Sequence, residues 1–104
     1  MENAIKIEIT QEGDETVIRV GGRLDTNTSP EFEGAVAPVL SSAVSHIKLD
    51  CGALDYVSSS GLRQLLRIQK NIAQKKGMLR LVGLKPAIRE VLDVTGFSML
   101  FRIE

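Results

Sequence analysis

Three consecutive serines followed by a glycine, residues 58–61, are the part of this sequence whose residue types most clearly suggest chemistry. They lie between the apolar end of an expected strand and an amphipathic segment that begins at Leu62. The hydroxyls should therefore lie at the start of a helix, where the first N–H groups lack intrahelical partners and the helix dipole is positive. A hydroxyl can cap the helix there, and an added phosphate is favoured electrostatically. The segment predicts either ordinary helix capping or a phosphorylation switch.

Length, composition and charge limit the classes of protein to which this chain can belong. With 104 residues, 43% of them hydrophobic, the chain can build one core, so we expect a single domain over residues 1–104. Thirteen basic and thirteen acidic side chains cancel, so no global field draws the protein to nucleic acid or to a membrane surface. The single cysteine, Cys51, excludes an internal disulfide and fits a reducing compartment. The first residues lack a secretory signal, and we expect a cytoplasmic protein without membrane insertion.

Apolar periodicity predicts strands that alternate with helices. The expected elements are strands at 4–11 and 16–20, a helix launched by a capping box at 28–31, a strand from about 46 to 51, a helix at 60–76, a strand at 78–82, a helix from Pro86 to Gly96, and a strand at 99–103. The order β-β-α-β-α-β-α-β favours an α/β fold with a mixed, mostly parallel sheet and right-handed crossover helices. Sites in such folds lie at the carboxyl ends of strands, which points to the loops at 21–28 and 52–60.

The helix expected at 60–76 separates apolar from basic side chains. Its apolar side carries Leu62, Leu65, Leu66, Ile68, Ile72 and Ala73. Its opposite side carries Arg63, Arg67, Lys70 and Gln74, near the azimuth of Ser60. This basic stripe is either a solvated face or a surface for a phosphate or an acidic partner group.

Three segments carry a family resemblance that covers nearly the whole chain. They are Gly-Arg-Leu-Asp at 22–25, Leu-Asp-Tyr-Val-Ser-Ser-Ser-Gly-Leu at 54–62 and Val-Gly-Leu-Lys-Pro-Ala-Ile at 82–88. In order and spacing they resemble STAS domains, and the stand-alone form resembles bacterial anti-sigma factor antagonists. The resemblance implies a STAS-like fold and partner switching that regulates transcription. It also implies phosphorylation of the serine directly before the glycine, which is Ser60 here, with Ser59 and Ser58 as the less favoured acceptors.

The resemblance also implies the partners. The unphosphorylated antagonist would bind an anti-sigma factor that is itself a serine kinase and so release the sigma factor, and phosphorylation would end this binding. A metal-dependent serine phosphatase would restore the first state. ATP and Mg²⁺ would belong to the kinase, so no cofactor, metal or catalytic residue is expected in this chain.

Asp25 matches the family's acidic residue in the loop before the first helix, so we assign it to the partner-binding edge; a local turn or helix cap is the alternative role. The expected partner-binding residues are Asp25, Thr26, Ser58, Ser59, Ser60, Gly61, Arg63 and Arg67. The chain departs from the best-known branch of the family at Ser58, where aspartate is common.

Two other classes of function compete with the switch. A hydrolase could combine a serine with His46 and Asp25, but the sequence has no Gly-x-Ser-x-Gly elbow. One cysteine with one histidine also makes a poor metal site, and Cys51 is expected to be a buried thiol. The alternative that remains is a STAS scaffold without a switch, as a subunit of a signalling or membrane transport complex.

Overall fold

In the computed structural model, which describes residues 4–104, the first two strands form the expected antiparallel hairpin. β1 (Ile5–Glu12) and β2 (Glu15–Leu24) are joined by a turn at Gly13, whose φ of +63° suits a glycine. Residues 1–3, which the expected domain includes, lie outside the described residues.

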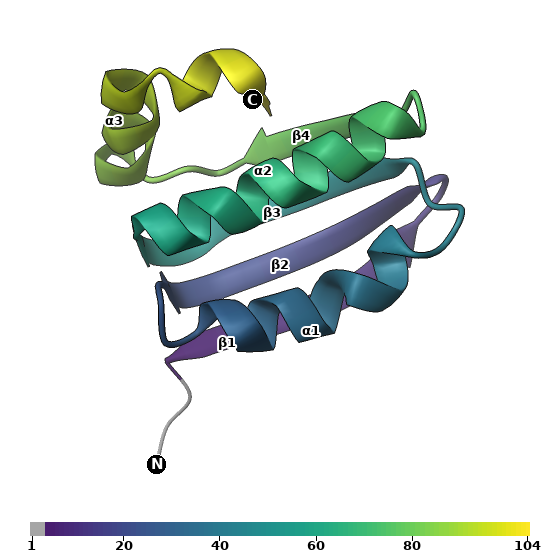
Figure 1. Ribbon diagram of the computed structural model, residues 1–104, viewed down its shortest axis with the longest axis horizontal. Coiled ribbons are helices and arrows are strands. Elements are labelled where there is room, and N and C mark those ends of the chain that lie inside the picture. Colours follow the sequence, from purple (N-terminus) through teal and green to yellow (C-terminus); the bar gives the residue numbers. More distant parts are fainter. Residues whose placement is uncertain (1–3) are drawn as a thin grey trace.

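Three further strands extend this hairpin into one five-stranded sheet. β3 (His46–Val57), β4 (Met78–Val82) and β5 (Arg102–Ile103) follow in the order β1-β2-β3-β4-β5, and every pair after the first is parallel. α1 (Ser29–Leu40), α2 (Ser59–Gln74) and α3 (Pro86–Thr95) make the crossovers, the last together with a 3₁₀ turn at Phe97–Leu100. α1 and α2 run side by side along one face of the sheet (Figure 1). The expected order and mixed sheet of a single α/β domain are confirmed.

β2 and β3 are longer than the sequence suggested, because the glycines at 21, 22 and 52 lie inside strands. Gly21 pairs with Ala53, and a Cβ on Gly21 would lie 3.0 Å from that of Ala53. Gly22 has a φ of +87° beside the backbone of Ala4. The register of β2 against β3 shifts on both sides of this glycine pair, as at β-bulges. The first half of the expected loop at 21–28 and most of the one at 52–60 are therefore strand.

Two other expectations about element ends were wrong. Thr28 begins α1 without a side-chain cap, because its hydroxyl donates to the carbonyl of Arg23 (2.8 Å) and accepts from the N–H of Asp25 (2.9 Å). The last strand begins at Arg102 and not at Met99, since the αL conformation of Gly96 leads into the 3₁₀ turn. The side chain of Met99 points outward and is 90% exposed. None of the helices within residues 4–104 is long and apolar enough to cross a bilayer.

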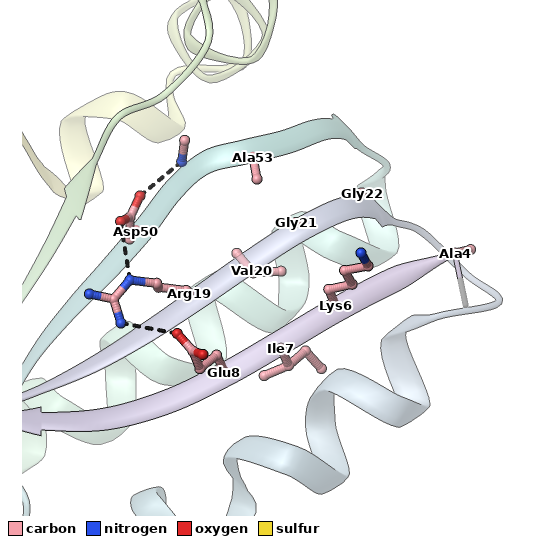
Figure 2. Close-up of a pocket in the computed structure, with 11 residues that line it drawn as sticks. Ala4, Lys6, Ile7, Glu8, Arg19, Val20, Gly21, Gly22, Asp50 and Ala53 are labelled. Carbon is pink, nitrogen blue, oxygen red and sulfur yellow. Dashed lines mark hydrogen bonds and ion pairs between the residues drawn. The ribbon is translucent and has the colours of Figure 1, made fainter. Parts of the chain in front are cut away.

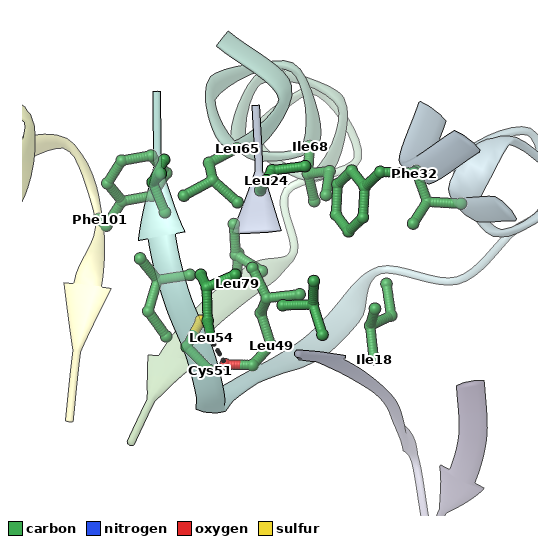
Figure 3. Close-up of a cluster of buried hydrophobic side chains, with 14 of the residues drawn as sticks. Ile18, Leu24, Phe32, Leu49, Cys51, Leu54, Leu65, Ile68, Leu79 and Phe101 are labelled. Carbon is green, nitrogen blue, oxygen red and sulfur yellow. Dashed lines mark hydrogen bonds between the residues drawn. The ribbon is translucent and has the colours of Figure 1, made fainter. Parts of the chain in front are cut away.

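The core lies between the sheet and the helices (Figure 3). Phe32 of α1 and Leu65 of α2 are fully buried against the sheet side chains, which include Leu49 and Leu54. Burial of one such side chain contributes about 1.5–3 kcal/mol. Cys51 is also buried, as expected, and burial together with the charge of Asp50 raises the pKa of its thiol to about 12.

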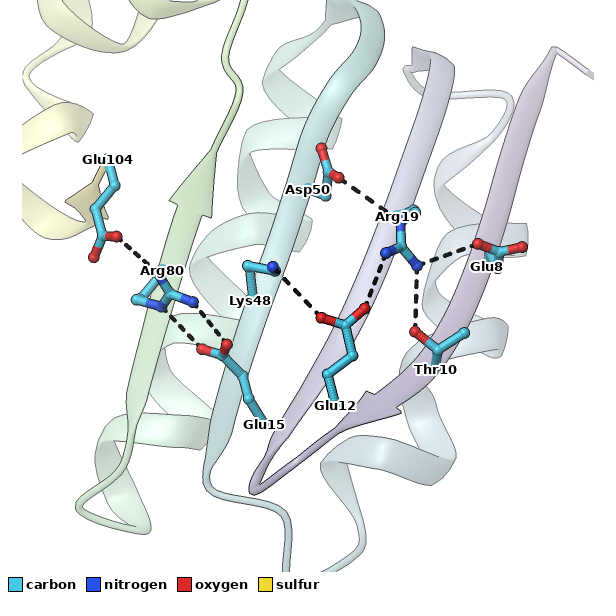
Figure 4. Close-up of polar contacts among 9 residues, drawn as sticks. All are labelled: Glu8, Thr10, Glu12, Glu15, Arg19, Lys48, Asp50, Arg80 and Glu104. Atoms are coloured by element: carbon cyan, nitrogen blue, oxygen red, sulfur yellow. Dashed lines mark hydrogen bonds and ion pairs between the residues drawn. The ribbon is translucent and has the colours of Figure 1, made fainter.

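Charged side chains form ion pairs on the opposite face of the sheet, which no helix covers within residues 4–104 (Figure 4). Arg80 donates to both carboxylate oxygens of Glu15 (2.7 and 2.9 Å) and to Glu104 (2.7 Å). Arg19 lies between Glu12 at 3.1 Å and Glu8 at 3.3 Å. We call this surface the open face.

The Glu15–Arg80 pair predicts a pH-dependent contribution to stability. Hydrogen bonds from Arg80 hold the pKa of the Glu15 carboxyl below its ordinary 4.5. The contribution is therefore present above pH 4.5 and is lost as the pH falls through the lowered pKa. Urea unfolding should show Glu15→Gln less stable than the wild type by on the order of 1 kcal/mol at neutral pH, with a smaller difference in acid.

The matched control is Glu90→Gln, an exposed carboxylate of α3. It should behave like the wild type at both pH values. A Glu15→Gln deficit that is the same in acid as at neutral pH would contradict a charge-dependent role for Glu15.

Candidate functional site

The start of α2 is held directly against the end of β2. The N–H of Ser58 donates to the carbonyl oxygen of Leu24 at 3.0 Å. A Cβ on Gly61 would lie too close to the same oxygen, and 2.9 Å from Cγ of Leu24. Only a glycine lets the helix approach this closely, so the two loops that follow β2 and β3 meet at one edge of the sheet.

The three serines have three different environments. Ser58 is the N-cap of α2, and its Oγ accepts from the N–H of Gly61 at 3.3 Å. Ser59 is exposed, whereas Ser60 is partly buried in the first turn. The expectation that a serine hydroxyl caps this helix is confirmed for Ser58.

Ser60 lies against the loop that follows β2. Its Oγ is 3.1 Å from Oγ1 of Thr26, and either hydroxyl can be the donor. This contact joins residues 34 positions apart in the sequence. The hydroxyl of Ser60 therefore has a defined position at the positive end of the helix dipole.

Asp25 shapes the loop that carries Thr26. Its Oδ1 accepts from the N–H groups of Asn27 (2.9 Å) and Thr28 (3.1 Å), as in an Asx turn. The Thr28 and Asn27 N–H groups, with help from Arg23, hold the pKa of this carboxyl below its usual range. The Asp25 side chain is only 18% exposed. The structure thus gives Asp25 the local turn role, and a direct partner contact stays a prediction.

Two exposed contacts beside the serines were missed by the sequence analysis. The guanidinium of Arg23 lies 4.3 Å above the ring centroid of Tyr56, a cation–π contact. Lys85, just before α3, pairs with Asp55. Tyr56 is 42% exposed. It is the chain's single tyrosine and lies two residues before Ser58, so the sequence could have marked it as a candidate site residue.

A groove between α1 and α2 brings four of the expected site residues together. This hollow of about 510 Å³ is lined by Thr26, Ser60, Arg63 and Arg67, and on the α1 side by Pro30 and Glu33. Glu33 accepts from Gln64 at 3.0 Å and lies 3.9 Å from Arg67. Glu33 was not expected from the sequence, because the expectations for α1 were confined to its apolar face. Gly61, by contrast, is buried and takes a packing role.

The residues of a serine hydrolase are not assembled. His46 begins β3, and Ser58 follows the end of that 12-residue strand. At about 3.3 Å per residue, the strand keeps the imidazole far from the serines at 58–60, and its Nδ1 lies instead 3.1 Å from the hydroxyl of Ser45. Within residues 4–104, histidine, cysteine and carboxylate side chains also form no group of three that could hold a metal ion.

A second hollow, of about 820 Å³, lies on the open face and exists because its floor is made of small residues (Figure 2). Gly21, Gly52 and Ala53 leave this space. Most of its charged rim is paired internally, since Arg19 contacts both Glu8 (3.3 Å) and Asp50 (3.8 Å), whereas Lys6 forms no ion pair within residues 4–104. We therefore place the candidate site at the groove beside Ser60.

Comparison with known proteins gives the family of the chain. The family model described as the STAS domain matches residues 6–104. The chain belongs to the STAS domain family. BtrV of Bordetella bronchiseptica, a provisionally named anti-sigma factor antagonist, is 35% identical over 82 residues, which are 79% of this chain and 71% of BtrV.

Solved STAS structures share the fold. An anti-sigma factor antagonist from Mycobacterium paratuberculosis superposes with a TM-score of 0.86 at 24% identity, covering 95% of this chain and 84% of that one. The Bacillus cell fate determinant SpoIIAA, in its phosphorylated form, superposes with a TM-score of 0.74 at 18% identity, covering 95% and 91%. At these identities the likeness establishes the architecture of the STAS domain.

The tight approach of α2 to β2 predicts that Gly61→Ala destabilises the STAS domain by about 1–3 kcal/mol, since the new methyl group meets backbone. Urea unfolding measures the difference. The matched control is Gly34→Ala in α1, where a Cβ meets nothing within 4 Å, so the domain should gain about 0.5–1 kcal/mol. Equal stability of both variants would contradict the packing role of Gly61.

Proposed function

We propose that this STAS domain is a phosphorylation-switched anti-sigma factor antagonist. The unphosphorylated form binds an anti-sigma factor that is also a serine kinase, and thereby frees the sigma factor. Phosphorylation of Ser60 ends this binding, and a metal-dependent serine phosphatase restores it. The observation that carries the proposal is the Ser60 hydroxyl, which lies in the first turn of α2 and lines the groove with Thr26 and Arg63.

In this proposal the chain regulates the sigma factor by binding the anti-sigma factor in the cytoplasm. It catalyses no reaction itself. ATP and Mg²⁺ belong to the kinase, and the chain itself takes no cofactor. The fold that it shares with SpoIIAA, of which a phosphorylated form has been solved, supports this function.

The contacts of the three serines favour Ser60 as the acceptor. The Ser58 hydroxyl already accepts the N–H of Gly61, so a phosphate there would disturb the cap. Ser59 is exposed but does not line the groove. Ser60 is next to the free N–H groups of the first turn and three residues before Arg63, so its phosphate gains favourable partners.

Serine in place of the family's common aspartate at position 58 fits this role. Serine and aspartate are both strong N-cap residues, and Ser58 makes the cap contact here. The departure therefore preserves the local geometry around Ser60. It also removes one negative charge close to the acceptor.

Phosphorylation changes the affinity for the partner and leaves the fold of the domain unchanged. A phosphate adds about −1.5 to −2 charges, yet its interaction with a helix terminus is worth only about 0.3–1 kcal/mol. A thousandfold loss of partner affinity needs about 4 kcal/mol, which desolvation and repulsion of a dianion inside an interface can supply.

The choice of acceptor is tested by incubating the chain with its cognate kinase and ATP and mapping the phosphate by mass spectrometry. Phosphate should appear on Ser60 and should be lost in Ser60→Ala. Ser59→Ala is the matched control, because it removes a neighbouring hydroxyl that makes no contact with Thr26, and it should be phosphorylated normally. Full phosphorylation of Ser60→Ala at an unchanged rate would refute the assignment.

The switch itself is tested by calorimetry with the kinase carrying one fixed nucleotide. The phosphorylated chain should bind at least about tenfold more weakly, or about 1.4 kcal/mol, and keep its circular dichroism spectrum. Ser60→Asp should reproduce part of the loss, because a carboxylate carries less charge and fewer oxygens than a phosphate. Equal affinity of both forms would reject the switch and favour the scaffold function.

A further inference from the structure

The groove beside Ser60 continues along the whole pair of helices. Another hollow, of about 800 Å³, lies farther along α1 and α2, and it shares Gly34, Ala37 and Arg67 with the groove beside Ser60. Lys70, Asn71 and Gln74 line its α2 side. We call the two connected hollows the helix groove; it extends from Thr26 and Ser60 to the last turn of α2.

The floor of the helix groove contains a glycine that packing does not require. Gly34 lies in the interior of α1, where glycine is less favourable than alanine. A Cβ at this position would meet no heavy atom within 4 Å outside the backbone of its own helix, and the side-chain carbons of Pro38 also lie beyond that distance; its φ is not positive. What the glycine does provide is space, because both hollows are lined by it.

One wall of the helix groove is basic. Arg63, Arg67 and Lys70 are exposed on α2, and the positive end of the helix dipole lies at the Ser60 end. Within residues 4–104, Arg63 and Lys70 form no ion pair, and Arg67 reaches only Glu33, at 3.9 Å. Glu33 is also the one acidic residue lining either hollow in that part of the chain. The wall therefore has an excess of positive charge that an acidic occupant would neutralise.

The groove also contains unmet hydrogen-bond acceptors. Gln64 Oε1 and Asn71 Oδ1 are buried and accept no hydrogen bond, although the amide nitrogens of both residues donate to Glu33 and to the carbonyl of Leu40. Both oxygens are shielded from solvent, so the surface that an occupant of the groove can reach is the exposed basic wall.

We propose that the helix groove docks an acidic segment of a partner protein, which passes over Gly34 and pairs with Arg63 and Lys70. The inference rests on the proposed function in one respect, because it explains how Ser60 acts on the partner. A phosphate on Ser60 places a dianion at the mouth of the groove, where it competes for Arg63 and repels the acidic segment.

The test uses a fluorescein-labelled decaglutamate peptide and fluorescence anisotropy, at about 50 mM and about 300 mM salt. The peptide should bind more weakly at the higher salt. Lys70→Glu should weaken binding by at least about fivefold, since it reverses a charge on the wall. Gly34→Gln should also weaken peptide binding by at least about fivefold without any change of charge, because the glutamine side chain fills the floor of the groove.

Matched controls distinguish the groove from general attraction. Lys6→Glu makes the same charge change on the open face, and Ala87→Gln adds the same side chain to exposed α3. Both should stay within about twofold of the wild type. An equal loss for Lys6→Glu and Lys70→Glu, or unchanged binding by Gly34→Gln, would overturn the proposal.

An oligothymidylate of equal charge tests the class of occupant. Tighter binding of the oligonucleotide than of the peptide would overturn the choice of a protein segment. The peptide assay contains no kinase, so its failure beside a confirmed Ser60 switch would reject the groove alone. If the groove binds the peptide but phosphorylation leaves the affinity for the kinase unchanged, the switch alone is rejected.

Discussion

The contact between the first turn of α2 and the last residue of β2 is the constraint on which the site depends. Gly61 has no side chain, so the helix can lie against the Leu24 carbonyl while Ser58 donates to the same oxygen. This approach brings the loop after β2 beside the start of α2, which puts Thr26 within hydrogen-bond distance of Ser60. A bulkier residue at position 61 would separate the two loops, and Thr26 would move away from Ser60.

The distribution of charge gives the two faces of the domain different properties. The formal net charge is zero, but this sum conceals local differences. On the open face, cations and carboxylates alternate across neighbouring strands and largely satisfy one another, as Arg80 does with Glu15 and Glu104. Along α2 the cations face a groove that, in the described part of the chain, is lined by one carboxylate, that of Glu33. A partner that senses charge would therefore distinguish the helix side from the sheet side.

Hydrophobic periodicity made most of the fold predictable. It identified the hairpin, the amphipathic α2 and the short strand β4, because their core-facing residues are apolar at the expected spacing; Ile9 and Met78 are apolar but exposed. Turn chemistry was less reliable. Gly21 and Gly22 are typical turn residues, yet they lie in a bulged strand, where the close approach of Ala53 and Ala4 decides their conformation. Such long-range contacts leave no pattern in the sequence next to the glycines.

The candidate site was predictable to the extent that it is local. The serine–glycine segment indicated a helix start, and the spacing of Arg63 and Arg67 placed both on the solvent side of that helix. The pairing of Thr26 with Ser60, and the use of Asp25 to shape a turn, depend on how two distant loops meet. Glu33 and Gly34 line the groove only because α1 and α2 lie next to each other, which the sequence does not show.

The environment of Cys51 has a practical consequence for experiments on this protein. The thiol is fully buried in the middle of the sheet, and with a pKa near 12 almost none of it is thiolate at neutral pH. Alkylating reagents and maleimide dyes need an accessible thiolate, so the native chain should be inert to them while folded. A cysteine introduced on the surface would then be the single labelled position, and spectroscopic probes could be attached without replacing any core residue.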